Sequence, residues 1–332
     1  MSEVAASTPV PGPPPLRFHR LLHALPRYRW WKPLVALVIA AVLWIILTVV
    51  VAGACLLIAL ALGEFRTDTE QHLLSDVTAF LTIDAANPLS LIAGLGGVAT
   101  LLPSVLIGYL SVGLRPLAVL RSVQFRLRWR WLALCLVPAL VITLLANAAD
   151  LFILPLVAGG GFPLAPTTNL GLFLLCALVI VVLTPIQAAA EEFAFRGLLG
   201  QMFGAWIKWV WLVIPLSGVV FAAAHTQYLG WATADVFVFA LVAGYVTWRT
   251  GGLEAGIALH AANNTVAFLA LATGIGGTTR NVGGAGDPWS LLVTIITMGL
   301  YVLWVEWLAR RRRVQNVLEP LSGAVSPAAG NS

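Results

Sequence analysis

The stretch Gln187-Ala188-Ala189-Ala190-Glu191-Glu192-Phe193-Ala194-Phe195-Arg196-Gly197 places two adjacent carboxylates and an arginine at the end of an apolar run. Charges beside a low-dielectric segment are costly, so such acids indicate a functional site by default. On a helix, Glu192 and Arg196 stand four residues apart and can pair, whereas Glu191 points about 100° away. We expect Glu191 to lack a cationic partner, which suits a general base. The simpler alternative is that both acids lie among lipid headgroups where this helix ends.

The composition of the chain is that of a lipid-embedded protein. Hydrophobic residues make up 60% and charged residues 10% of the 332 residues, and the mean hydropathy is +0.93. Soluble domains do not reach such values. The net charge of +5 comes from arginines gathered at the ends of apolar runs, so we expect no nucleic-acid partner. The three cysteines lie in apolar runs without CxxC spacing, which predicts neither disulfides nor a thiolate metal site.

Eight apolar runs predict eight membrane-spanning helices. The predicted helices are 33–62, 88–113, 131–157, 169–196, 209–225, 231–248, 255–273 and 289–309. Clusters of arginine precede the first run, follow the second and follow the last, and such clusters stay on the cytoplasmic side of a membrane. Eight spans with both termini cytoplasmic satisfy every cluster. The predicted fold class is therefore an all-α membrane protein with about eight transmembrane helices.

We expect a single transmembrane domain, residues 33–313, between two disordered ends. Residues 1–32 begin with a Pro-rich stretch and continue with five basic residues, which predicts a disordered, basic N-terminal arm. Residues 314–332 are rich in Pro, Gly, Ala and Ser and predict a disordered tail. No internal repeat is evident, which counts against a transporter built from two related halves.

Two of the five histidines lie within or at the end of apolar runs. His225 follows Phe221 by one helical turn, so that Phe221 can orient the imidazole, and Asn264 follows His260 by one turn on the same face. Alanines beside these residues let neighbouring helices approach closely. A single membrane histidine is more often a structural hydrogen-bonding residue than a catalyst. Three polar sites in one chain favour a shared function.

The motifs Glu191-Glu192-x-x-x-Arg196, Phe221-x-x-x-His225 and His260-x-x-x-Asn264 resemble, in this order, the three signature motifs of the CAAX-processing and bacteriocin-processing family of intramembrane proteases, also called the Abi family. The resemblance covers about residues 169–273, a protease-like core. It implies an endopeptidase that cuts peptide bonds at membrane depth. The implied working residues are Glu191, His225, His260 and Asn264. Their implied supporting residues are Glu192, Arg196, Phe221 and Asn263.

Peptide hydrolysis needs an activated water and stabilisation of the developing oxyanion. Glu191 would accept the proton, His225 would hold the water, and His260 with Asn264 would donate hydrogen bonds to the tetrahedral intermediate. A rival chemistry places Zn²⁺ on Glu191, His225 and His260, since two histidines and a glutamate form a known catalytic set. The family is often labelled metalloprotease. We prefer the metal-free mechanism, because the chain lacks H-E-x-x-H and an asparagine lies one turn after His260.

One spacing conflicts with a shared site. At about 1.5 Å per residue, His225 lies roughly 26 Å along its helix from Lys208, near the outer side. Glu191 and His260 are expected within a few turns of the inner side. Either the helix of His225 begins below the interface, or tilted and broken helices bring the three residues together in a water-filled cavity.

Two other functions stay open at this level. A non-catalytic binding or immunity protein could keep the same fold, and a proton-coupled transporter could use Asp150, Glu191 and Asp235. We expect membrane lipid and a peptide or lipidated peptide as partners, with no indication of prenylation or of oligomeric state. The expected location is the plasma membrane of a bacterium, as a multi-pass protein.

Overall fold

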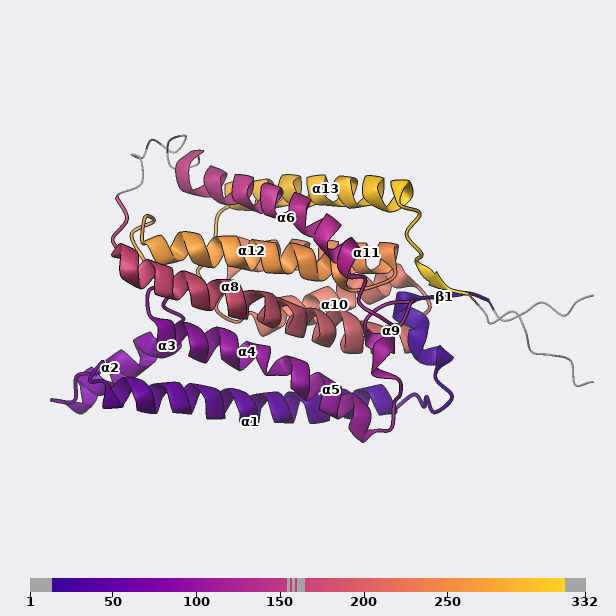
Figure 1. Ribbon diagram of the computed structural model, residues 1–332, viewed down its shortest axis with the longest axis horizontal. Helices are drawn as coiled ribbons and strands as arrows, with labels where there is room; N and C mark the ends of the chain where they lie inside the picture. Colours follow the sequence, from indigo (N-terminus) through magenta and orange to yellow (C-terminus); the bar gives the residue numbers. More distant parts are fainter. Residues whose placement is uncertain (1–13, 154–155, 157–158, 160–164, 320–332) are drawn as a thin grey trace, which may run out of the picture.

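The computed structural model describes residues 14–153, 156, 159 and 165–319. Figure 1 shows a bundle of helices that run along the longest axis of the molecule. Within the described residues, seven helical runs are long and apolar enough to cross a membrane. These runs are α1 (Lys32–Ala61); Pro88–Ser111 (α3 Pro88–Leu91, η2 Ile92–Gly96, α4 Gly97–Ala99, α5 Leu101–Ser111); Trp129–Ile153 (α6 Trp129–Ala148, η4 Ala149–Ile153); Leu170–Trp206 (α8 Leu170–Glu192, η5 Phe193–Leu199, α9 Gly200–Trp206); α11 (Gly230–Thr250); α12 (Glu254–Thr273); and α13 (Pro288–Arg311).

The eighth predicted span is a shorter helix. α10 (Val210–Ala224) has 15 residues, or about 22 Å of helix, which falls short of a hydrocarbon layer of about 30 Å. Shorter elements complete the described fold: β1 (Leu16–Arg17), η1 (Phe18–Ala24), α2 (Glu70–Leu81), η3 (Leu117–Leu120) and β2 (Val317–Leu318). The prediction of an all-α membrane protein is confirmed, and most helix ends lie within two residues of the predicted ones.

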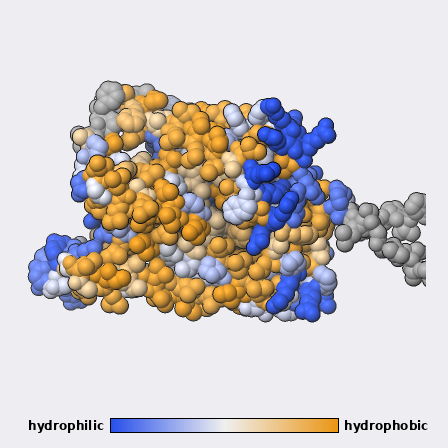
Figure 2. Space-filling model, in the orientation of Figure 1, coloured by the Kyte–Doolittle hydropathy of each residue, from blue (hydrophilic) through white to orange (hydrophobic). Residues whose placement is uncertain are grey.

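Apolar side chains cover the outside of the bundle. Figure 2 shows a broad hydrophobic band across the middle of the visible face, with hydrophilic residues gathered at the two ends of the molecule. In α1, the most apolar 18-residue window has only 11% of its residues buried inside the protein. Leu, Ile and Val side chains that face outward in water would be unfavourable by about 25 cal/mol per Å². The band is therefore a lipid-facing surface, and the chain is a multi-pass membrane protein.

The two ends of the bundle differ in charge. We call the end formed by residues 14–31, 112–128, 207–209, 251–253 and 312–319 the basic end, and the opposite end, with residues 62–87, 149–153, 225–229 and 274–287, the acidic end. Figure 1 shows both ends of the described chain at the basic end, near β1. Among the loops at the acidic end, the sequence has two arginines, Arg66 and Arg280. Cytoplasmic orientation of the termini stays a prediction.

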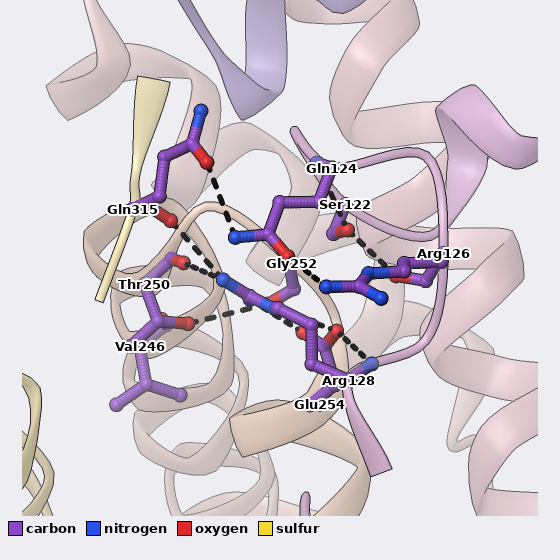
Figure 3. A network of polar contacts seen from close by, with 9 residues as sticks. All are labelled: Ser122, Gln124, Arg126, Arg128, Val246, Thr250, Gly252, Glu254 and Gln315. Atoms are coloured by element: carbon purple, nitrogen blue, oxygen red, sulfur yellow. Dashed lines mark hydrogen bonds and ion pairs between the residues drawn. The ribbon is translucent and has the colours of Figure 1, made fainter. Parts of the chain in front are cut away.

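The basic end is closed by a polar network, which Figure 3 shows at close range. Arg128, just before α6, donates to the carboxylate of Glu254 at the start of α12, with Nη2 and Oε2 2.6 Å apart. The Arg128 side chain is 9% exposed and that of Glu254 is fully buried. Nη1 of Arg128 also donates to the carbonyls of Thr250 and Gln315. One arginine thus joins the starts of two helices to the C-terminal segment.

The expectation of a disordered arm over residues 1–32 is wrong for its described part. Residues 1–13 lie outside the described residues, but η1 packs against α9 and buries Phe18, Leu21 and Leu22. Gly204 of α9 permits this contact, because a Cβ there would collide with the carbonyl of His19. The composition of the arm suggested disorder, yet its three apolar residues recur on one side of the segment and find an apolar surface.

The expectation of a disordered tail over residues 314–332 also needs correction. β2 pairs with β1 in an antiparallel arrangement, with Leu16 opposite Leu318 and Arg17 opposite Val317. The two ends of the described chain therefore hold each other in place. Residues 320–332 lie outside the described residues.

The helix predicted to end at Arg196 continues to Trp206. The chain passes through a π-helical segment, η5, into α9, and Leu198 of η5 and Met202 of α9 are buried. The hydroxyl of Ser217 in α10 donates to the carbonyl of Phe195 at 2.8 Å within this irregular segment. π-helical segments occur frequently at functional sites. This one begins directly after Glu192.

Candidate active site

A cavity of about 520 Å³ lies among α6, α8, α10, α11, α12 and α13. Six of the eight predicted site residues line it: Glu191, Phe221, His225, His260, Asn263 and Asn264. The other two, Glu192 and Arg196, lie behind the wall and are buried. The predicted residues from three separate helices therefore meet.

The sequence placed His225 at a different depth from Glu191 and His260, and the length of the helical run through α8 and α9 removes this difference. Glu191 stands 15 residues before Trp206, the end of that run, and His225 stands 15 residues after Val210. Because Trp206 and Val210 are joined by a short connection, Glu191 and His225 lie at similar heights, about 22 Å from it. His260 of α12 lies at the same level, because its Nε2 is 3.3 Å from Oε2 of Glu191.

His260 lies between the two glutamates. Its Nδ1 is 2.9 Å from Oε1 of Glu192, and its Nε2 is 3.3 Å from Oε2 of Glu191. Arg196 donates from Nη1 to the same Oε1 of Glu192 at 2.9 Å, as the spacing predicted, and from Nη2 to the carbonyl of Ala240 in α11. A continuous row of charged and titratable groups thus runs from Arg196 through Glu192 and His260 to Glu191.

The expectation that Glu191 has no cationic partner is corrected by this row. His260 comes from another helix, and the i,i+4 rule that paired Glu192 with Arg196 says nothing about neighbouring helices. Oε2 of Glu191 is buried and makes no hydrogen bond despite its 3.3 Å approach to the imidazole. If Nδ1 of His260 donates to Glu192, the contact between Nε2 of His260 and Glu191 is favourable only when one of these two groups carries a proton that the other accepts.

Phe221 holds His225 and His260 in place. Nδ1 of His225 is 2.8 Å from the carbonyl of Phe221, and the two rings are 4.5 Å apart between centroids. The Phe221 ring also meets His260 edge to face at 5.9 Å, while Arg196 stacks over Phe221 at 4.5 Å. With Nδ1 directed to a carbonyl, the Nε2 atom of His225 is free to act toward the cavity. The predicted orienting role of Phe221 agrees with these contacts.

The amides of α12 form a second polar group. Nδ2 of Asn264 donates to Oε1 of Gln187 in α8 at 3.2 Å, and Nδ2 of Asn263 donates to Oδ1 of Asn264, also at 3.2 Å. An amide nitrogen carries two N–H bonds, so Asn264 keeps one more donor for a group in the cavity. Because the side-chain carbonyl of Gln187 accepts from Asn264, the donor side of the Asn264 amide faces Gln187.

The three zinc candidates fit a metal site incompletely. Tetrahedral zinc ligands lie about 3.3 Å apart, as Glu191 and His260 do. Nδ1 of His260 meets Glu192, an arrangement that also orients metal-ligating histidines. Yet among the described residues no three His, Cys, Asp or Glu side chains are grouped closely enough to hold a metal ion. His225 does not complete the set in this arrangement, and we derive no step through a metal.

Comparison with known families supports the same segment. A family model described as type II CAAX prenyl endopeptidase Rce1-like matches residues 169–266. We call these residues, after the model that they match, the Rce1-like segment. The match contains all three motifs up to Asn264 and confirms the resemblance seen in the sequence. It leaves the first 168 residues and α13 outside the Rce1-like segment.

Two curated relatives match part of the chain. An uncharacterized protein of Bacillus subtilis (strain 168), YyaK, is 33% identical over 102 residues, which are 29% of this chain and 34% of the relative. An uncharacterized 24.3 kDa protein of Escherichia coli is 33% identical over 98 residues, 29% of this chain and 44% of that protein. The chain thus spans less than half the length of the curated relatives it matches. No solved structure matches.

Sequence reasoning missed Gln187 and Phe239 in the Rce1-like segment. Gln187 precedes Glu191 by four residues on the same helical face, so the i,i+4 spacing could have identified it. Phe239 of α11 meets the His260 ring edge to face, with centroids 4.9 Å apart. Phe239 follows Asp235 by one helical turn, but an aromatic residue in an apolar run gives no signal of its own.

Proposed function

We propose that the chain is an intramembrane endopeptidase that hydrolyses peptide bonds of membrane-associated or lipidated peptides. The Rce1-like segment supports a protease, and one observation about the site carries the proposal. Glu191 is only 8% exposed, lines the cavity, and presents an oxygen without a hydrogen bond beside His260. A buried acid in that setting can take a proton from water.

In the proposed reaction, a water oxygen attacks the carbonyl carbon of the scissile bond and its proton passes to Glu191. His225 holds the water through Nε2, while His260 and the remaining N–H of Asn264 stabilise the negative oxygen of the tetrahedral intermediate. The carbon–nitrogen bond then breaks, and the proton held by Glu191 passes to the departing amine. Glu192 and Arg196 keep His260 in position.

The metal-free form of this mechanism is our preference, with Zn²⁺ on Glu191, His225 and His260 as the alternative. Two of these residues already have the spacing of metal ligands, and the third does not. Metal analysis of purified protein, together with activity after chelation, distinguishes the two forms. Full activity without bound metal would remove the zinc form, whereas loss on chelation and recovery with Zn²⁺ would remove ours.

We further propose that the protein acts in the plasma membrane of a bacterium, where membrane lipid and a peptide substrate are its partners. The relatives in Bacillus subtilis and Escherichia coli and the lipid-facing band support this location. The mixed walls of the cavity, from Phe268 and Met298 to Asn264, accept a peptide with or without a lipid.

The test compares membrane peptides from cells that carry the native chain, Glu191→Gln or Glu70→Gln. Quantitative proteomics of new peptide termini should show a set of cleavages that disappears in Glu191→Gln. Glu70 is exposed on α2, outside the cavity, so Glu70→Gln should retain the same cleavages. Equal thermal unfolding of the two variants excludes a folding defect. Cleavages that persist in Glu191→Gln would contradict the proposal.

The same experiment addresses the non-catalytic alternative. A binding or immunity protein keeps its phenotype in Glu191→Gln, because an amide preserves the shape of the side chain. A proton-coupled transporter would need a proton path from Glu191 to the basic end. Glu192 and Arg196, which lie behind the cavity wall, are buried and paired with each other. The described cavity therefore favours a site over a channel.

A further inference from the structure

The cavity extends beyond the proposed catalytic residues toward the acidic end. There it is lined by Asp150 of η4 and Asp235 of α11, together with Asn147 and Thr294. Asp150 is exposed, whereas Asp235 is half-buried and its Oδ1 atom is fully buried without a hydrogen bond. The cavity thus carries two separate acidic places: Glu191 in its buried part and this aspartate pair near its mouth.

No described cation pairs with Asp150 or Asp235 within 4 Å. The residues outside the described ranges contain no Lys, Arg or His. Two other acids at this end do have cationic partners. Asp76 pairs with Arg66 and Asp84 with Arg280.

Structural contacts account for Asp235 only in part: Thr294 of α13 approaches its carboxylate, yet Oδ1 has no hydrogen bond. An acid in the first turn of a helix is stabilised by the helix dipole, but this effect falls off beyond that turn. α11 begins at Gly230, so Asp235 stands in its second turn. Burial of one oxygen without a hydrogen bond is unfavourable. A cation bound in the cavity would offset that cost by neutralising the charge of the carboxylate.

We propose that Asp150 and Asp235 form a subsite for a positively charged group of the substrate peptide, an ammonium or a guanidinium. This inference rests on the proposed protease function and names its substrate class. The cavity is continuous from the exposed Asp150 to Glu191, which lines it and is itself more than nine-tenths buried, with its Oε2 atom without a hydrogen bond. A cationic residue held at the aspartates places a neighbouring part of the same peptide beside Glu191. Acidic peptides are disfavoured by like charge.

The test measures binding to the full-length Glu191→Gln variant in detergent micelles, so that substrate is held and not cut. The probes are four peptides of equal length with an uncharged dye, bearing lysine or norleucine at one position and a free or acetylated N-terminus. Fluorescence anisotropy should show about tenfold tighter binding of a cationic peptide than of its neutral match. The lysine and N-terminus pairs tell which ammonium is recognised.

Asp150→Asn with Asp235→Asn, added to Glu191→Gln, should reduce that preference to within about twofold, and each single change should reduce it in part. Asp76→Asn is the control, because it removes a negative charge from the same end outside the cavity. Equal thermal unfolding of all variants shows that the fold is retained. A preference that survives the double change, or no preference before it, would overturn the subsite.

Cleavage of the same peptides by the native chain, followed by mass spectrometry, separates the two proposals. Charge-selective binding without cleavage leaves the subsite in place and removes the protease. Cleavage without charge selectivity leaves the protease in place and removes the subsite.

Discussion

Buried charges are paired at the basic end of the molecule, whereas toward the acidic end a buried carboxylate oxygen is left unpaired. At the basic end, Arg128 and Glu254 neutralise each other in the interior and donate or accept several further hydrogen bonds. Toward the acidic end, Asp235 leaves an oxygen buried without a hydrogen bond, next to a cavity that reaches Glu191. Buried charges are stable when paired, whereas unpaired ones mark functional sites. The paired charges stabilise the fold at the basic end, and we propose that the cavity toward the acidic end binds a ligand.

The difference in charge between the two ends also predicts how the protein is oriented in the membrane. Arginine clusters remain on the cytoplasmic side of a membrane, so the basic end is expected there. The cavity then opens on the opposite side of the membrane. The predicted substrate therefore approaches from outside the cytoplasm, where the exposed Asp150 and Gln227 line the mouth.

The largest expected effect is an all-or-none difference in labelling. Gln227→Cys at the acidic end should react with a membrane-impermeant maleimide in intact cells, and Arg126→Cys at the basic end should react only after permeabilisation. Both positions are exposed, and the three native cysteines are buried. A mass shift on gels reports the reaction, with the unaltered chain as control. The reverse pattern would invert the orientation and place the mouth in the cytoplasm.

Loss of the ion pair between Arg128 and Glu254 at the basic end should produce the next largest effect, a decrease in stability. Arg128→Met leaves the fully buried carboxylate of Glu254 without its cation, and loss of one partner of such a pair destabilises a protein by about 3–5 kcal/mol. Thermal unfolding in detergent micelles measures the change. Arg126→Met is the matched control, because the side chain of this exposed arginine makes a single hydrogen bond, to Gln124 at 3.3 Å (Figure 3). Equal stability of the two variants would mean that the network does not close this end.

The sequence predicts the bundle well because a lipid-facing helix is a local property. Hydropathy gave α1 as 33–62 and α13 as 289–309, against Lys32–Ala61 and Pro288–Arg311 in the structure. The pairing of Glu192 with Arg196 followed from spacing within one helix. Motif resemblance brought His225, His260 and Asn264 to one cavity, which helix spacing alone placed at different depths.

Contacts between distant segments were not predictable in this way. The position of His260 between two glutamates depends on how α12 packs against α8, and no single-helix rule contains that information. The pairing of Leu16 with Leu318 joins residues from the two ends of the described chain. The arm and the tail have the composition of disordered segments, and they are ordered by an apolar surface that other helices provide.

Acidification should weaken the basic end by a smaller amount. Burial of His19 in η1 lowers its pKa from 6.5 to about 4, with Arg20 and Arg17 adding to the shift and the carbonyl of Lys208 opposing it. The unfolded chain therefore binds a proton at this histidine between pH 6.5 and 4 while the folded chain does not, so stability falls as pH falls. The loss is about 2 kcal/mol between pH 7 and pH 5.

Unfolding of the native chain and of His19→Gln at pH 7 and pH 5 measures this contribution. His19→Gln should lose less stability on acidification; His23, whose pKa burial also lowers, keeps part of the effect. Asp76 at the acidic end behaves differently, because hydrogen bonds from Arg66 lower its pKa to about 2. Its contribution is lost only below about pH 4. An identical pH dependence in His19→Gln would show that the arm is not packed as described.

The smallest effect on stability is expected for the ion pair of Arg66 and Asp76, although its short distance alone would suggest a large one. Arg66 and Asp76 approach to 2.6 Å, the same distance as Arg128 and Glu254, but their side chains are 60% and 20% exposed. Water screens an exposed pair and solvates whichever partner remains, so Arg66→Met should leave the unfolding temperature within the scatter of the measurement. Measured beside Arg128→Met, it tests whether burial or distance determines what an ion pair contributes. A comparable loss in both variants would show that the acidic end, too, depends on its paired charges for stability, and that its openness is confined to the cavity between Asp150 and Glu191.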